Sequence, residues 1–207
     1  LNVASIASPI GKVKLIDQAD GTNNKYVSFK KYLQKDVAKA CDRAHAFETK
    51  LIRGFSFYPP RGESPELYLE QAVDQIGQIA ESCHRSDLTF GLEVEANLVG
   101  QNGDLLAEIH RRVNHPALVL VFDAANLLVQ GFSTRQVFSQ WKAMKPGLGW
   151  VHIKDYRKVT ASMRGKHVDE DMLAHFVPAD CGAGGHGKIL QDLKGMLPGL
   201  TRRLKRR

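Results

Sequence analysis

The chain has 207 residues, of which 43% are hydrophobic and 25% charged, a composition that is typical of a folded globular protein and argues against disorder. Its length suits one domain better than two, and no apolar run approaches the roughly 18 residues that span a bilayer, so we expect a soluble, cytoplasmic protein. The net charge of +7 is concentrated in a basic tail, about residues 194–207, which is more typical of a solvated helix end than of a nucleic-acid-binding surface.

Short apolar runs alternate along the chain with longer segments of helical periodicity. The apolar runs, which we predict to be strands, cover residues 2–8, 51–57, 88–96, 117–125 and 149–155. The predicted helices cover residues 27–48, 65–85, 103–113 and 134–144, and a last helix begins near Gly187. Two helix starts carry capping signals, with Ser64 before Pro65 and Ser133 before Thr134.

Strands that are apolar on both faces and separated by single helices indicate a parallel sheet in an α/β fold. Five such βα units follow one another in the sequence. Length alone favours an open, doubly wound sheet, because a closed (β/α)8 barrel takes about 250 residues. The polar residues at the strand ends favour a barrel instead.

The third apolar run, LTFGLEVEAN at residues 88–97, places two carboxylates on one face of a predicted strand. Apolar residues at every second position, from Leu88 to Val94, alternate with a face that ends in Glu93 and Glu95. If both faces of the strand are buried, each ionised carboxylate needs a metal, a cation or a proton, because burying an unpaired charge costs several kcal/mol. This strand is therefore the first candidate position for a functional site.

Polar residues also follow the bodies of the next two strands. The three strand ends together display Glu93, Glu95 and Asn97, then Asp123 and Asn126, then His152, Lys154, Asp155 and Arg157. Functional groups gather at the carboxyl ends of parallel strands, and Glu, Asp and His are ligands for Mn²⁺, Mg²⁺, Co²⁺ or Zn²⁺. Spacing alone leaves two explanations open, a divalent-metal site or helix capping and salt bridging by the same residues.

These segments resemble the sugar phosphate isomerase/epimerase family, within the xylose isomerase-like (β/α)8 barrels. The resemblance rests on GLEVEAN, VFDAAN, WVHIKDYR and VPADCGAGGHG, in that order and spacing. The opening VASIASPIGK is similar to the family's third barrel strand, and RGFSF to its fourth. The resemblance implies a partial (β/α)8 TIM barrel with about five βα units of parallel strands, which forms a single, incomplete domain over residues 1–207. We therefore expect a fragment that covers barrel strands three to seven.

The resemblance also implies one divalent metal ion held by residues from four strand ends. Glu93 matches the family's first Glu, Asp123 the Asp of its D-x-x-[HN] motif, and His152 the His of its H-x-K-D motif. The fourth ligand, a Glu on the eighth strand, has no counterpart before Arg207, and Asn126 stands where many epimerases have His. We therefore expect an incomplete metal site and impaired activity.

The implied activity is isomerisation or epimerisation of a sugar or sugar phosphate, by proton transfer beside a carbonyl through an enediolate. Glu93 is the implied catalytic acid/base as well as a metal ligand. The residues expected to contact the substrate are Glu95, Asn97, Asn126, Asp155, Arg157 and His186, with Lys154 and Arg53 as weaker candidates. Glu95 is placed either for the substrate or for pairing with a base such as Lys154, and Asp155 and Arg157 have surface ion pairing as their alternative.

Two other functions stay open. The apurinic endonuclease branch shares this superfamily and its metal chemistry, but it implies several zinc ions and further His ligands on earlier strands, for which residues 2–8 and 51–57 offer no candidate. Alternatively, the chain is a non-catalytic truncated barrel or binding domain. Because missing strands leave unpaired sheet edges, we hypothesise that the chain self-associates into a homo-oligomer that covers them.

Overall fold

The computed structural model describes residues 2–157 and 166–204 and contains a five-stranded parallel sheet. The strands are β1 (Ile6–Ala7), β2 (Leu51–Gly54), β3 (Thr89–Glu93), β4 (Leu118–Asp123) and β5 (Leu148–His152). Each strand pairs in parallel with the next one along the chain, so the spatial order is β1-β2-β3-β4-β5. All five carboxyl ends therefore lie along the same edge of the sheet.

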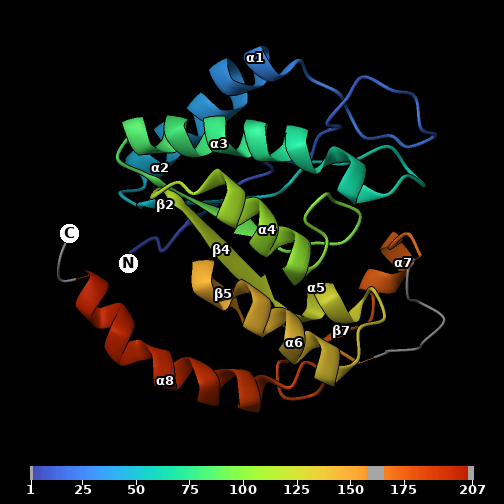
Figure 1. Cartoon of the computed structure of the whole chain (residues 1–207), viewed down its shortest axis with the longest axis vertical. Helices are drawn as coiled ribbons and strands as arrows, with labels where there is room; N and C mark the ends of the chain where they lie inside the picture. Colours follow the sequence, from blue (N-terminus) through green and yellow to red (C-terminus); the bar gives the residue numbers. More distant parts are fainter. Residues whose placement is uncertain (1, 158–165, 205–207) are drawn as a thin grey trace.

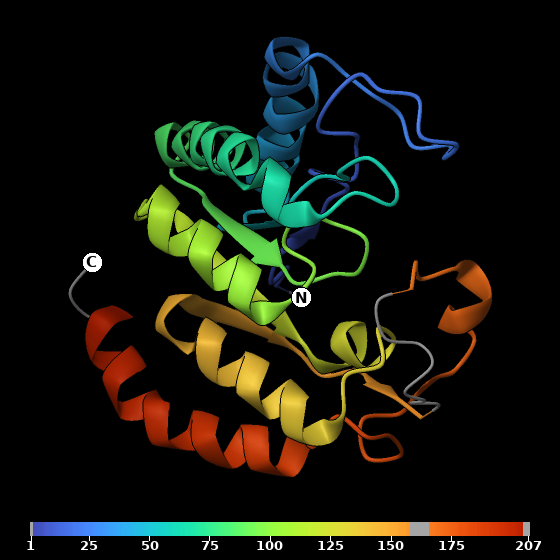
Figure 2. The same cartoon turned by 45° about the vertical axis from the view of Figure 1, so that its right-hand side comes forward.

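Helices connect the strands and cover the outer side of the sheet (Figures 1 and 2). Between β1 and β2 the helical segment consists of α1 (Phe29–Tyr32), a π-helical turn (Leu33–Val37) and α2 (Ala38–Ala46). The later helices are α3 (Leu69–Arg85), entered through a 3-10 turn (Pro65–Tyr68), α4 (Gly103–Val113), α6 (Thr134–Met144), followed by a 3-10 turn (Lys145–Gly147), and α8 (His186–Leu204). Figure 2 shows α3, α4, α6 and α8 following one another along one side of the strands.

The apolar core lies between the sheet and these helices. Along β3 and its continuation, Phe90, Leu92 and Val94 are completely buried, and Ile76 and Ile79 of α3 belong to the same apolar cluster. A strand buries every second residue and a helix every third or fourth, so both periodicities come from burial against a common core. The parallel α/β fold predicted from those periodicities is confirmed.

The two predicted capping residues behave differently. Ser133 forms a capping box, because its hydroxyl accepts from the Gln136 N–H at 3.4 Å and the Gln136 side chain accepts from the Ser133 N–H at 3.0 Å. The Ser64 side chain makes no hydrogen bond to the helix backbone, and its hydroxyl donates to Glu66 instead. The bounds of α4 and α6 agree with those predicted from the sequence.

Four short elements at the carboxyl edge of the sheet were not predicted. Helix α5 (Ala124–Leu128) begins directly after β4, and α7 (Glu170–Leu173) precedes β7. Strand β6 (Asp155–Tyr156) pairs with β7 (Phe176–Val177) in a small antiparallel ribbon. Figure 1 shows α5, α7 and β7 together at the end of the sheet toward which β4 points. These elements contain too few residues for a periodic pattern to reveal them.

The sheet is open, in agreement with the predicted partial barrel. Within residues 2–157 and 166–204, β1 and β5 each have one hydrogen-bonded neighbour in the sheet, and self-association over these edges stays a prediction. Of the predicted basic tail, residues 205–207 lie outside the described residues. No helix of the described chain combines the length and apolarity needed to cross a membrane.

Trp141 joins α6 to both the sheet and α8, so its removal is expected to destabilise the fold. Its ring is fully buried against Phe122 in an edge-to-face contact with centroids 5.1 Å apart, and its indole N–H donates to Asp192 at 2.8 Å. We expect Trp141→Ala to lower the free energy of unfolding by about 3–5 kcal/mol, measured by urea denaturation. The exposed Arg135→Ala on the same helix is the control and should change it by less than about 0.5 kcal/mol. A similar loss in both variants would contradict this role for Trp141.

Candidate metal centre

Three side chains from neighbouring strands meet at the carboxyl edge of the sheet. Glu93 is the last residue of β3, Asp123 of β4 and His152 of β5, and Asp123 lies opposite His152 in the strand register. One potential ligand atom from each lies within 4.8 Å of the other two. They come together because the three strands are adjacent and parallel, so that residues far apart in the sequence share one edge.

The carboxylate of Glu93 is buried and surrounded by polar groups, with the residue 4% exposed. Its Oε1 accepts a hydrogen bond from Asn126 Nδ2 at 3.3 Å and lies 2.9 Å from His152 Nδ1. Its Oε2 lies 3.1 Å from Arg53 Nε, an ion pair that lacks the alignment of a hydrogen bond. Both oxygens of this buried charge are therefore compensated, as a charge removed from water requires.

The two oxygens of Asp123 have different roles, and the residue is 1% exposed. Oδ1 accepts from the backbone N–H of Asn126 at 3.1 Å and caps α5. Oδ2 lies 3.2 Å from Lys154 Nζ and 3.7 Å from His152 Nδ1. Helix capping and salt bridging, the second explanation left open by the sequence, thus apply to Asp123. Capping and salt bridging do not exclude metal ligation by Asp123, because its Oδ2 is not used for the cap and lies near His152.

The two carboxylates make His152 a stronger base than a free imidazole. Its interaction with Asp123, followed by that with Glu93, favours the imidazolium form, outweighs burial and raises the pKa of His152 to about 9. Below that pH, the metal-free protein holds a proton on His152 between the two acids. The two carboxylates therefore stabilise a positive charge placed between them.

Glu93, Asp123 and His152 fit a divalent metal ion. Two carboxylate oxygens and one imidazole nitrogen form a donor set suited to Mn²⁺, Mg²⁺, Co²⁺ and Zn²⁺. Three protein ligands leave coordination positions for a substrate, as in catalytic rather than structural metal sites. Across the described residues, this is the one group of three His, Cys, Asp or Glu side chains that could hold an ion.

The three groups line a cavity of about 740 Å³, here called the metal-site cavity. Glu95 also lines it and forms an ion pair with Lys12, rather than with Lys154 as the sequence suggested. Burial raises the pKa of Glu95, with the neighbouring Glu93 adding to the rise and Lys12 opposing it. A carboxyl group with a raised pKa exchanges protons closer to neutral pH than an ordinary carboxyl group does.

Aromatic rings support the cations of the metal-site cavity. The Phe55 ring lies under two of them, with its centroid 4.4 Å from Lys12 Nζ and 4.6 Å from the Arg53 guanidinium. The Phe176 ring of β7 lies 4.4 Å from Lys154 Nζ. Such cation–π contacts hold a charged side chain in place without neutralising it.

Asn126, which was predicted to contact the substrate, connects several groups of the site. Besides its bond to Glu93, its Nδ2 donates to the Val94 carbonyl at 3.0 Å, and its Oδ1 accepts from Lys154 Nζ at 2.8 Å. Gln130 donates to the Asn126 carbonyl at 2.6 Å and fixes the start of α5. The Asn126 amide therefore orients Glu93 and Lys154 relative to each other.

Two of the predicted substrate contacts, Asp155 and His186, secure the loop before α8, and their contact with a substrate stays a prediction. Asp155 is 2% exposed and accepts from two backbone N–H groups at 2.8 Å, one of them that of Gly184. His186 Nε2 lies 3.0 Å from the Lys154 carbonyl. A Cβ at Gly182 would approach Asp155 Oδ1 to 2.3 Å, so glycine is needed there for the loop to come this close. Neither Asp155 nor His186 lines the metal-site cavity.

Arg157 and Asn97 are also not brought to the candidate metal ligands. Arg157 is exposed, and its Nε donates to the Cys181 carbonyl at 3.4 Å. Asn97 exchanges two hydrogen bonds of 3.0 Å with the backbone of Val168 and lines a different cavity. Substrate contacts by these residues stay predictions.

Sequence reasoning missed Lys12, Phe55 and Phe176. A basic residue in the loop after a predicted strand, as in the segment SPIGK, is the signal that indicates Lys12. Phe55 follows β2 directly and belongs to the same class of strand-end residues. Phe176 comes from the two-residue strand β7, which has no periodic signal, and only the folded chain places it against Lys154.

Metal affinity is expected to rise with pH, because His152 must lose its proton before it can bind an ion. With a pKa of about 9 in the metal-free protein, the proton competes throughout the range below that value. We expect the Mn²⁺ affinity to increase by up to about tenfold per pH unit between about pH 6 and 8, with release of one proton per ion. Calorimetric titration in buffers of different ionisation enthalpy measures both quantities. A pH-independent affinity without proton release would rule out His152 as a ligand.

Residues 14–197 match the family model described as xylose isomerase-like TIM barrel, whereas no curated protein matches the sequence. Among solved structures, the chain is similar to the probable 3-DHS dehydratase AsbF involved in petrobactin synthesis from Bacillus anthracis. The TM-score is 0.67 and the sequence identity 19%, and the match covers 94% of this chain and 67% of that one. It is similar to a xylose isomerase-like TIM barrel protein from Mycobacterium smegmatis in complex with magnesium, with a TM-score of 0.64 and 15% identity over 92% and 61% of the two chains. A third similar structure is D-psicose 3-epimerase in the presence of D-fructose, with a TM-score of 0.54 and 13% identity over 72% and 50%.

At these identities the structural likeness concerns the fold. The chain spans between 50% and 67% of the length of these three proteins, so it corresponds to a part of each. The family match extends over residues 14–197 and therefore includes the strand ends that carry Glu93, Asp123 and His152.

Proposed function

The chain belongs to the xylose isomerase-like TIM barrel family, and on this premise we propose that it is a divalent-metal-dependent isomerase or epimerase of a sugar or sugar phosphate. The observation that carries the proposal is the group formed by Glu93, Asp123 and His152 at the carboxyl edge of the sheet. One similar structure is a complex with magnesium, and another was determined in the presence of D-fructose, which supports a metal and a sugar as ligands of this fold.

The proposed reaction removes a proton from the carbon beside a carbonyl and leaves an enediolate. Return of a proton to the opposite face of the same carbon gives the epimer, and return to the neighbouring carbon gives the isomer. When bound, the metal supplies Lewis acidity to the carbonyl and hydroxyl oxygens of the sugar. The remaining chemistry is proton transfer and substrate positioning by side chains of the metal-site cavity.

In this proposal, Glu93 holds the metal and Glu95 moves the proton. Both oxygens of Glu93 face His152, Asn126 or Arg53, which makes its carboxylate a ligand rather than a free base. Glu95 is the carboxylate of the cavity outside the ligand group, and burial raises its pKa. The sequence suggested Glu93 for both tasks, and separate replacement of Glu93 and Glu95 distinguishes the two assignments.

Two cations beside the candidate ligands favour an oxygen-rich, negatively charged substrate. Arg53 lies next to Glu93, and Lys154 lies next to Asp123. A divalent ion would neutralise those carboxylates, so that the charges of Arg53 and Lys154 would become available to substrate oxygens. This supports a sugar phosphate over an uncharged sugar, with Asn126 keeping Lys154 in position through its 2.8 Å hydrogen bond.

The nuclease alternative has less support. It implies several metal ions and additional His ligands, whereas the described residues contain one potential three-residue metal group, with a single His. The one-metal chemistry of a sugar isomerase or epimerase fits this set better.

Solvent deuterium exchange tests the proposed function even when the sugar product is unidentified. The chain is incubated in D₂O with Mn²⁺ and a panel of ketoses and ketose phosphates, and deuterium at the carbons beside the carbonyl is followed by NMR. We expect uptake into at least one sugar that depends on both protein and metal, since each abstracted proton exchanges with solvent. A protein with bound Mn²⁺ that gives no uptake above the protein-free control across the panel would contradict the proposal.

A further inference from the structure

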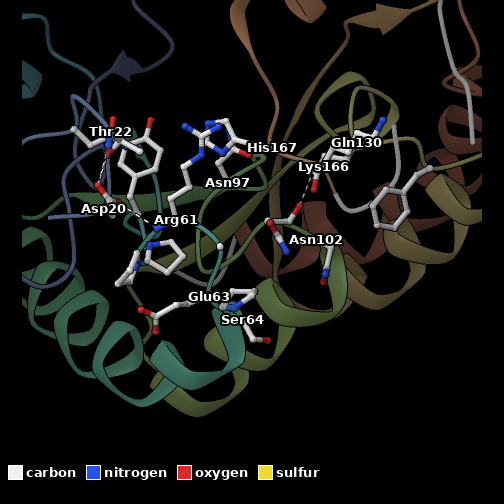
Figure 3. A pocket seen from close by; sticks show the side chains of 18 residues that line it. Asp20, Thr22, Arg61, Glu63, Ser64, Asn97, Asn102, Gln130, Lys166 and His167 are labelled. Carbon is white, nitrogen blue, oxygen red and sulfur yellow. Dashed lines mark hydrogen bonds between the residues drawn. The ribbon is translucent and has the colours of Figure 1, made fainter. Parts of the chain in front are cut away.

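A second cavity lies at the carboxyl edge of the sheet and is shown in Figure 3; it is here called the outer cavity. It is formed by later parts of the loops that follow β1, β2 and β3, together with residues after α5 and the pair Lys166 and His167. Its volume of about 630 Å³ is in the range of small-molecule sites. It shares no lining residue with the metal-site cavity, so the two are separate candidate sites.

The first acid of the outer cavity, Asp20, is neutralised within the protein. It forms an ion pair with Lys14 at 2.6 Å and accepts hydrogen bonds from the Thr22 hydroxyl at 2.7 Å and the Arg61 backbone N–H at 3.2 Å. Burial opposes its ionisation, but the bonds from Lys14, Thr22 and Arg61 outweigh burial and hold the pKa of Asp20 well below its ordinary value. Asp20 is therefore ionised, and its negative charge is already compensated by Lys14 and by hydrogen bonds within the protein.

The second acid, Glu63, is also engaged. It accepts a hydrogen bond from the Tyr68 hydroxyl at 2.5 Å and from Gln18 Nε2 at 3.1 Å. Neither the Glu63 nor the Asp20 side chain therefore forms an ion pair with the side chain of Arg61 or Lys166, the two cations of the outer cavity.

Two cations of the outer cavity have no such partner. Arg61 and Lys166 are exposed, and neither side chain forms an ion pair or hydrogen bond with any described residue. In Figure 3, Arg61 lies between Asp20 on one side and Asn97 and His167 on the other. The cavity therefore combines unpaired positive charge with acids that are already compensated.

The backbone around Arg61 is constrained before any ligand binds. Pro59 and Pro60 precede it, its own N–H is bound to Asp20, and Gly62 follows in a left-handed conformation with φ of 86°. Glycine adopts that conformation without strain, which lets the chain turn directly after Arg61. A side chain on a fixed backbone loses less entropy on binding than one on a mobile loop.

We propose that the outer cavity binds the oxyanion group of a small molecule, a phosphate monoester or a carboxylate, through the Arg61 guanidinium. A guanidinium offers parallel N–H donors that match two oxygens of such a group. Lys166 adds a second positive charge, and Asn24, Tyr58 and Asn102 line the cavity with further polar groups. Binding there needs no metal ion and is independent of the proposed isomerase or epimerase activity.

The test is a titration of the metal-free chain with inorganic phosphate and, separately, with acetate, at constant ionic strength. Chemical shifts in ¹H–¹⁵N spectra locate the bound anion, including the Nε–H signal of Arg61. We expect saturable shifts around Arg61 and a dissociation constant that rises about tenfold or more in Arg61→Gln, with a smaller rise in Lys166→Gln. Arg43→Gln, which changes an exposed arginine on α2, is the matched control and should leave the constant unchanged.

Tighter phosphate binding identifies a phosphate group as the preferred ligand, and equal or tighter acetate binding identifies a carboxylate. Each of those results supports the proposal. It is overturned if neither anion gives saturable shifts, if Arg61→Gln binds as tightly as the parent chain, or if Arg43→Gln weakens binding equally. Shifts confined to Lys12, Arg53 and Lys154 would place the anion in the metal-site cavity and would also overturn it.

Discussion

Replacing Glu93 by Gln or Asp123 by Asn is expected to weaken Mn²⁺ binding by about 100-fold or more. Each change keeps the size of the side chain but removes a negative charge from a group whose ligand atoms lie within 4.8 Å of one another. Loss of an outer-shell partner of a metal site typically costs about 10–100-fold, and a direct ligand should cost at least as much. Affinity is measured by calorimetry or by the loss of the free Mn²⁺ signal in electron paramagnetic resonance.

The control for this pair is Glu108→Gln, an exposed carboxylate of α4 that pairs with Arg111. It should bind Mn²⁺ as the parent chain does. Unchanged affinity in both Glu93→Gln and Asp123→Asn would eliminate the site. Because the substitutions leave Arg53 or Lys154 beside a neutral group, circular dichroism must show that the variants are folded at the temperature of the titration.

Replacing Glu95 by Gln is expected to slow deuterium exchange by about 100-fold to 10,000-fold, the range for removal of a general acid/base. Mn²⁺ affinity should change by no more than a few-fold, because Glu95 is outside the ligand group and pairs with Lys12. This split between exchange rate and metal affinity separates proton transfer from metal binding. Equal exchange rates in Glu95→Gln and the parent chain would assign the proton to another group, with Glu93 as the first alternative.

A second variant, Lys12→Met, tests the same assignment through pH. The positive charge of Lys12 lowers the pKa of Glu95, so its removal raises that pKa further. If ionised Glu95 is the base, the pH at which exchange reaches half its maximum should move upward in Lys12→Met. A profile that does not move, or that moves downward, would be inconsistent with Glu95 as the base.

Local rules identified the strand ends as the place for a site, and the family resemblance then singled out three of their residues as candidate metal ligands. Glu93, Asp123 and His152 each end an apolar run, and consecutive parallel strands bring such ends to one edge. The same rule did not place Asp155 and Arg157, which follow β5 beyond its last paired residue. There the chain leaves the sheet and enters the β6–β7 ribbon, so a residue's distance from the strand end no longer tells where its side chain points.

Glu95 shows the limit of reasoning from spacing. Its burial on the strand continuation could be anticipated, but the sequence suggested a partner such as Lys154, whereas the structure pairs it with Lys12, 83 residues away. That choice depends on the loop after β1, whose path is set by its contacts with Phe55 and the β2 loop. Contacts between distant loops leave no periodic mark in either segment.

The sequence by itself determined the parallel α/β fold, because alternation and helical periodicity report burial residue by residue. The resemblance of its motifs to a known family implied the partial barrel and the three candidate metal ligands at the sheet edge. Only the tertiary structure decided that Asn126 orients Glu93 and Lys154, that Asp155 secures a loop, and that Arg61 lines a cavity whose acids are already paired. These facts depend on which loops approach one another across the sheet edge. Packing and electrostatics among residues tens of positions apart decide which loops come together, and no local sequence pattern encodes those contacts.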